Sequence, residues 1–132
     1  MSVFTATIQK IQEYDSLHIV DFDFQGQCLT MISLELGENL MVGKRVELTL
    51  KPTHIALGKN ISGTLSFANV INAKVDSFEN GVLLSTVKLL VEEVVLESIV
   101  TVESLKKMSL QKGSEVSLLI KASELSIARV LS

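Results

Sequence analysis

The chain has 132 residues, of which 47% are hydrophobic and 20% are charged, with a formal net charge of −3. This balance indicates a folded protein and excludes an intrinsically disordered one. No lysine- or arginine-rich stretch is present, which argues against binding to nucleic acid, because a protein of that class needs a basic patch.

Compartment and membrane contact follow from the same composition. Cys28 is the only cysteine and has no intramolecular partner for a disulfide, so a reducing compartment is expected. The first residues contain no basic region followed by an apolar stretch, as a signal peptide would. No stretch approaches the roughly 18 apolar residues of a membrane span. We therefore expect a soluble cytoplasmic protein with no membrane insertion.

In chain order, the first half of the sequence predicts strands around one short helix. Residues 4–9 alternate apolar and polar side chains, and residues 45–51 do the same, which is the period of a half-buried strand. Between them, residues 34–39 are expected to form a short helix.

The second half repeats this order of elements. Alternation at residues 75–78 predicts a strand, and residues 79–81 supply turn residues. Residues 82–97 are rich in valine and threonine, which favours two strands that turn near Glu92 and Glu93 over one helix. Residues 102–108 predict a short helix with Thr101 as its N-cap. Strands are then expected at residues 116–120 and 125–127.

An internal repeat organises the chain. Residues 40–57 match residues 110–127 at a constant offset, with glycine, lysine and alternating apolar positions in register. A polar, glycine-flanked stretch at residues 58–63 separates two units, predicted as residues 1–60 and 64–132. Each unit is too small for a stable core of its own, so we expect the two to pack together. The predicted fold is all-β, with two tandem OB-like barrels that each carry one short helix.

Catalytic chemistry is poorly supported by the sequence. His18 and His54 fall in predicted strands away from charged clusters, so structural roles are expected for both. Cys28 lies in the apolar stretch 28–32, which predicts a buried, inert thiol. With no histidine placed to activate a nucleophile, the chain is not predicted to be an enzyme.

Hydroxyl groups and a lysine in the second unit are suited to a tetrahedral oxyanion. Thr101 and Ser104 lie in the first turn of the predicted helix, where free backbone N–H groups favour an anion. Lys121 supplies a positive charge, and Ser123 supplies another hydroxyl. The alternative is that Thr101 and Ser104 only cap the helix and that Lys121 is a solvated strand residue.

A family resemblance favours the oxyanion hypothesis. The second unit resembles the Mop domain, also called the TOBE domain, of molbindins, molybdate transport ATPases and molybdate-responsive regulators. The first unit resembles a diverged copy. The resemblance is carried by residues 66–75, 100–104, 112–116 and 120–123. It implies OB-like barrels that form oligomers and bind molybdate or tungstate at interfaces.

The resemblance also implies a set of site residues. In the family, an opening Ser-x-Arg-Asn motif, the hydroxyls at the helix start and a Lys-Ala-Ser/Thr lysine contact the anion, without direct protein ligands to the metal. The residues that this implies for the second unit are Ser66, Phe67 (through its backbone), Thr101, Ser104, Lys121 and Ser123.

Two departures from the family pattern stand out. Ala68 replaces the family arginine, which removes a bidentate cationic donor. In the first unit, Lys51 matches the lysine and Ser33 approximately matches the threonine, but the second helix serine is missing. A complete site from the first unit alone is not expected. Ser33 and Lys51 are instead predicted to help line a second class of site between domains.

Two functions follow as hypotheses. The first is a free-standing protein that binds molybdate or tungstate for intracellular storage, homeostasis or sensing, as a homo-oligomer and in contact with a molybdate transporter. The second is a degenerate Mop module that serves as an oligomerisation or protein-interaction domain of a molybdate transport or regulation system. Ala68 and the diverged first unit favour the second.

Overall fold

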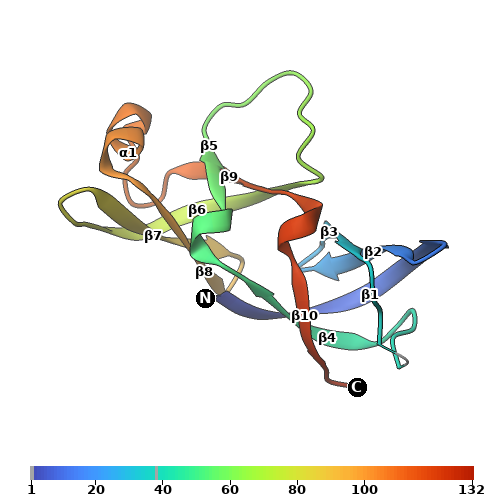
Figure 1. Cartoon of the computed structure of the whole chain (residues 1–132). Helices are drawn as coiled ribbons and strands as arrows, with labels where there is room; N and C mark the ends of the chain where they lie inside the picture. Colours follow the sequence, from blue (N-terminus) through green and yellow to red (C-terminus); the bar gives the residue numbers. More distant parts are fainter. Residues whose placement is uncertain (1, 38) are drawn as a thin grey trace.

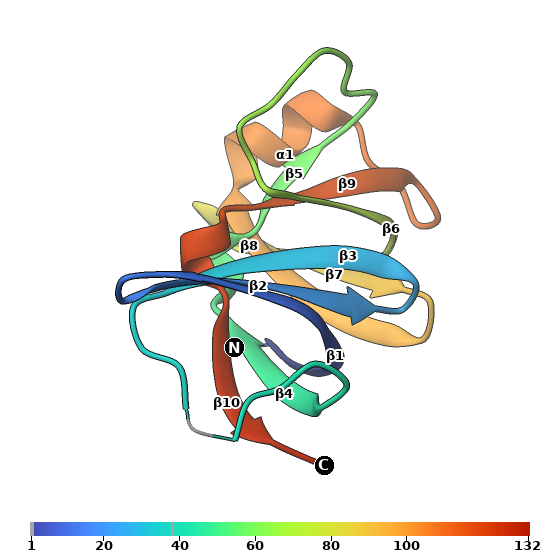
Figure 2. The same ribbon diagram turned by 90° about the vertical axis from the view of Figure 1, so that its right-hand side faces the viewer.

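The computed structural model describes residues 2–37 and 39–132. Within them, strands dominate and form two curled five-stranded sheets (Figures 1 and 2). The strands are β1 (Ser2–Tyr14), β2 (Leu17–Phe24), β3 (Gln27–Ser33), β4 (Arg45–Leu50), β5 (Ala56–Gly58), β6 (Asn69–Asn80), β7 (Leu84–Val91), β8 (Val94–Thr101), β9 (Glu115–Ile120) and β10 (Ser126–Val130). The helical elements are α1 (Val102–Met108) and the 3-10 turns η1 (Pro52–His54) and η2 (Ala122–Glu124). The predicted all-β, OB-like fold is confirmed.

The two sheets exchange their last strands. Their strand orders are β10-β4-β1-β2-β3 and β5-β9-β6-β7-β8, with antiparallel pairing. Strand β10 of the second repeat therefore completes the first sheet, and β5 of the first repeat completes the second. In Figure 1 the chain crosses between the sheets at the green turn η1 and at the red turn η2. The turns η1 and η2 are thus the points at which the chain passes from one sheet to the other.

The repeat is conserved in the fine detail of the backbone. Strands β1 and β6 each have a β-bulge, after Ile8 and after Val75. The carbonyl oxygens of Ile8 and Val75 accept hydrogen bonds from the N–H groups of Gly43 and Gly113, both at 2.8 Å. Both glycines have φ near +90°, at 94° and 88°, a conformation that L side chains rarely adopt. The glycine match in the sequence therefore reflects one shared turn geometry.

The helix expected in the first repeat does not form, so the prediction of one short helix per repeat is correct only for the second. Residues 34–37 and 39 are not helical, and Glu38 lies outside the described residues. Equivalent positions are 67 residues apart before this stretch (75 − 8) and 70 apart after it (113 − 43), so the first repeat is three residues shorter here. A helix this short cannot offset the cost of its first turn, and Gly37 raises that cost.

The ambiguous segment 82–97 forms two strands, as predicted. Strands β7 and β8 pair along their whole length, from Leu84↔Thr101 to Val91↔Val94. Glu92 and Glu93 make the turn between them, with Glu92 at φ 54°.

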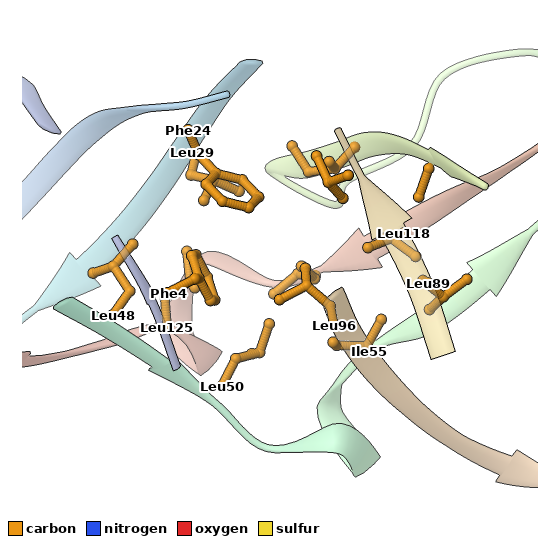
Figure 3. Close-up of a cluster of buried hydrophobic side chains, with 14 of the residues drawn as sticks. Phe4, Phe24, Leu29, Leu48, Leu50, Ile55, Leu89, Leu96, Leu118 and Leu125 are labelled. Carbon is orange, nitrogen blue, oxygen red and sulfur yellow. The ribbon is translucent and has the colours of Figure 1, made fainter. Parts of the chain in front are cut away.

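One continuous hydrophobic core serves both repeats. Figure 3 shows side chains from both sheets in the same cluster, among them Phe4, Leu48, Leu89 and Leu118. The rings of Phe4 and Phe24 lie 4.7 Å apart. Burying apolar surface from both repeats together stabilises units that would have little core alone.

The thiol of Cys28 is exposed, contrary to the expectation of a buried one. Its neighbours along β3, Leu29 and Met31, face the core. Because residues of a strand point to its two faces in turn, Cys28 faces outward. The apolar stretch around it misled the sequence-based expectation.

Candidate functional site

Lys121 lies at the start of η2, where β9 ends. Its side chain is exposed, and its carbonyl oxygen accepts a hydrogen bond from the N–H of Glu124 at 3.0 Å. Strand β9 pairs with β6 in an antiparallel register that ends at Asn69↔Ile120. One further step in this register places Ala68 beside Lys121. The segment with Ser66 and Phe67 thus approaches the turn of Lys121.

Strand β3 of the other repeat reaches the same place. The side chain of Asn69, fully buried, accepts a hydrogen bond from the N–H of Thr30 at 2.6 Å and donates one to its carbonyl oxygen at 2.9 Å. The side chain of Gln27 bonds the backbone of Asn72 in the same way, so β3 and β6 run antiparallel here. Ser33 at the end of β3 and Ser66 just before β6 therefore lie on the same side of this contact.

A pocket joins the ends of β3 and η2. Ser33 and Ser123 both line it, together with apolar side chains of residues 34–40 and of β10. We call the group Ser33, Ser66, Phe67, Lys121 and Ser123 site 1. It combines hydroxyls from both repeats with a lysine that has no ion-pair partner among the described residues. Such a set can donate hydrogen bonds to a tetrahedral anion.

The hydroxyl of Ser33 is engaged within the protein. It donates to the carbonyl oxygen of Glu35 and accepts from the N–H of Glu35. For Ser33 to donate to a ligand, this local turn has to open. Lys121 and the exposed hydroxyls of Ser66 and Ser123 require no such change.

Thr101 and Ser104 form a second group. The Thr101 hydroxyl accepts the N–H of Ser104 at 3.1 Å and donates to the Ser104 hydroxyl at 2.8 Å. The proton of the Ser104 hydroxyl is thereby left to donate outward. Strand β8, which ends at Thr101, packs against η1, which follows Lys51. We call Lys51, Thr101 and Ser104 site 2.

The start of α1 has fewer free backbone N–H groups for an anion than the sequence suggested. Of its first N–H groups, that of Val102 bonds the carbonyl oxygen of Leu83 at 2.9 Å, and that of Ser104 bonds Thr101. The helix has only seven residues, so its dipole is small. Side-chain hydroxyls therefore matter more in site 2 than the end of the helix.

The structure divides the predicted cluster of Thr101, Ser104 and Lys121. Helix α1 lies well apart from the red turn η2 in Figure 1, and η2 packs against β3. The turn after Lys121 instead packs against β3 of the first repeat, and the turn after Lys51 packs against β8 of the second. Analysis of the sequence missed Asn69, although a polar residue at an inward-facing strand position was a visible signal.

Residues 2–37 and 39–132 hold no group of three or more histidine, cysteine or acidic side chains placed to bind a metal ion. In the same part of the chain, no helix has the length and apolarity to cross a bilayer.

Comparison with known proteins identifies the second repeat. Residues 65–127 match the family model of the TOBE domain. The structure is similar to a crystal structure of the cytoplasmic molybdate-binding protein ModG with molybdate bound, with a TM-score of 0.88 and 27% sequence identity. The match covers 95% of this chain and 93% of that one. None of the curated proteins matches the chain.

Proposed function

From the match of residues 65–127 to the TOBE domain and from the similarity to ModG, we propose that this chain belongs to the Mop/TOBE domain family and is a cytoplasmic molybdate-binding protein rather than an enzyme. The similarity to ModG along nearly the whole chain, and not to the TOBE domain alone, supports this function. Molybdate and tungstate are tetrahedral dianions of nearly equal size, so both are proposed ligands. Storage, homeostasis or sensing of molybdenum is the proposed role, with a molybdate transporter as a proposed partner.

The observation that best supports the proposal is that Ser33 of the first repeat and Ser123 of the second line one pocket, beside the turn that begins at Lys121. Hydrogen bonds to a charged ligand contribute roughly 1.5–3 kcal/mol each. The free energy of four such bonds, less the free-energy cost of association, corresponds to a dissociation constant of about 1 μM. Site 2 offers the same elements, one lysine and two hydroxyls, so up to two anions are expected per chain.

The test is a calorimetric titration of the purified protein with molybdate, with sulfate as the competing anion. Saturable binding of molybdate that sulfate does not match is expected. The Lys121→Ala variant should bind at site 1 at least about tenfold more weakly, because it loses the charged donor. Lys112→Ala is the matched control, since Lys112 is an exposed lysine of the same repeat outside both sites. Equal affinity of Lys121→Ala and the wild type would refute site 1.

A second function is favoured by a different feature. The loop before β7 exposes Val82 by 94% and Leu83 by 77%, and the first residue of β7, Leu84, is exposed by 55%. Consecutive exposed apolar residues are typical of protein interfaces. With Ala68 in place of an arginine, this feature supports an oligomerisation or protein-interaction module. Self-association in sedimentation velocity without thermal stabilisation by molybdate would favour this function over the first.

A further inference from the structure

The two sheets differ in how far their crossing strands extend. In the first sheet, β10 pairs with β4 as far as Val130↔Val46. One residue further on, the N–H of Leu131 donates to the carbonyl oxygen of Arg45 at 2.8 Å. The C-terminal segment therefore covers the outer edge of β4 down to its first residue.

In the second sheet the equivalent edge is uncovered. Strand β5 pairs with β9 only as far as Gly58↔Ser117. The two preceding residues of β9, Glu115 and Val116, are equivalent to the first two residues of β4, 70 residues earlier (115 − 45). Among the described residues, no backbone N–H of the linker bonds the carbonyl oxygen of Glu115 in the way that Leu131 bonds the first sheet. This carbonyl oxygen is a free acceptor at a sheet edge, where another strand can pair.

Three features hold the linker after β5 away from this edge. The Lys59 ammonium donates to the carbonyl oxygen of Met108, at the end of α1, at 2.7 Å. Asn60 turns the chain with φ at 53°. The side chain of Ile61 then fills the space that a Cβ at Gly58 would need. The linker therefore leaves β5 as a wide green loop (Figure 1), and the edge of β9 stays open.

A groove of about 850 Å³ lies beside the uncovered edge, a volume typical of ligand sites. Its walls are β9, β6, the linker and the turns that follow β2 and β7. The linker and β9 contribute Gly58, Asn60, Ile61, Glu115, Val116 and Ser117. We call this the edge groove. It is distinct from sites 1 and 2, because it shares no lining residue with either.

The charge of the edge groove differs from that of the equivalent place in the first sheet. There, Arg45 Nε donates to the Ser132 hydroxyl at 3.2 Å, just beyond the paired segment. Glu115 puts a carboxylate at the same position of β9, and Glu92 adds a second to the groove. Among the described residues, Lys74 is the one cation in the lining, and it has no ion-pair partner. A segment with a basic residue at the position of Ser132 would therefore complement the groove.

We propose that the edge groove binds an extended, basic segment of a partner protein, which continues the line of β5 along β9. The backbone N–H of an apolar residue donates to the carbonyl oxygen of Glu115, as Leu131 does at Arg45. The next residue, a lysine or an arginine, pairs with the Glu115 carboxylate. Addition of a strand to an open sheet edge is a common way for proteins to bind peptides. This inference does not depend on oxyanion binding.

A synthetic peptide based on β10 tests the proposal. The probe has the sequence of residues 128–132, with arginine in place of Ser132 and with both ends blocked. It is titrated into the 15N-labelled protein, and the amide signals are followed by NMR. Saturable shifts at residues 115–117 are expected, with a dissociation constant below about 1 mM. The peptide that keeps Ser132 should bind at least about threefold more weakly, because it lacks the charge.

Two changes isolate the interactions. A peptide with proline in place of Leu131 lacks the backbone donor and should bind at least about fivefold more weakly. In the protein, Glu115→Lys should weaken binding of the basic peptide by about fivefold, because attraction becomes repulsion. Glu79→Lys is the matched control, at an exposed position of β6 outside the groove, and should change the affinity by less than about twofold. The amide spectra of both variants check that they fold.

Each contrary outcome overturns the proposal. Absence of shifts at residues 115–117 with about 5 mM peptide, or shifts only outside the groove, would show that the edge takes no strand. Equal binding of the proline peptide would show contact through side chains without strand addition. Shifts of the same amides with protein concentration alone would show that a second copy of the chain, and not a partner protein, occupies the groove.

Discussion

Ala68 is the position at which site 1 most clearly lacks a group that a strong anion site would have. The β6–β9 register places it beside Lys121, where a longer cationic side chain would reach site 1. An arginine there would add a planar donor that matches two oxygens of a tetrahedral anion. The chain instead has Lys121 alone as the charge of site 1.

An arginine at position 68 gives a direct prediction at the scale of the residue. Ala68→Arg should tighten molybdate binding by about tenfold, because one charge-assisted hydrogen bond contributes roughly 1.5–3 kcal/mol. Isothermal titration calorimetry measures the change. Val82→Arg adds the same charge at a side chain that is 94% exposed and outside both sites, so it should leave the affinity within about twofold. Equal gains in the two variants would show a general charge effect instead.

At the scale of the element, the contact of β3 with β6 positions the hydroxyls of site 1. The Asn69 side chain takes the place of backbone–backbone hydrogen bonds between β3 and β6, because it pairs with both the N–H and the carbonyl oxygen of Thr30. The equivalent contact in the other half is smaller: the N–H of Glu97 donates to the hydroxyl of Ser2 at 3.2 Å. Unpaired backbone groups at a buried position cost free energy, so the two contacts also fix the relative placement of the sheets.

Removing the Asn69 side chain should therefore destabilise the protein. Asn69→Ala leaves two backbone groups of Thr30 without partners, and we expect a loss of about 2–4 kcal/mol in the free energy of unfolding. Urea denaturation followed by circular dichroism measures it. Asn72→Ala is the control, because Gln27 bonds only the backbone of Asn72, and it should cost less than about 1 kcal/mol. Similar losses for the two variants would argue against the role assigned to Asn69.

At the scale of the whole molecule, strand exchange and the common core make the repeats interdependent. The first sheet needs β10 from the second repeat, and the second needs β5 from the first. The core cluster likewise includes Ile55 and Leu125, which lie in the crossing segments. Both proposed sites depend on this arrangement, since each combines residues from the two repeats.

Separate expression of the repeats tests this interdependence. Residues 1–60 and 64–132, the predicted units, should each give poorly dispersed amide spectra alone, because each lacks half of the core. Mixed at equal concentration, they should form a one-to-one complex with dispersed spectra. Two independently folded fragments that do not associate would show that the exchange is dispensable for stability.

The sequence alone predicted the strands, the duplication and a set of candidate residues for an oxyanion. Period-two alternation specified strands because one face of each must be buried, and the matched glycines marked a turn that only their backbone conformation allows. Lys121, Ser123 and the pair Thr101–Ser104 could be proposed as site residues because few residue types bind an oxyanion.

Only the tertiary structure decided which of these residues meet. Thr101 and Lys121 belong to one repeat, yet the crossing of the chain at η1 and η2 takes Lys121 to β3 and brings the turn that follows Lys51 to β8. The contact of His54 with Glu124 has the same origin. Alternation patterns report which face of a strand is buried, but they carry no information about which sheet a final strand joins. That choice depends on the burial of apolar surface from both repeats at once.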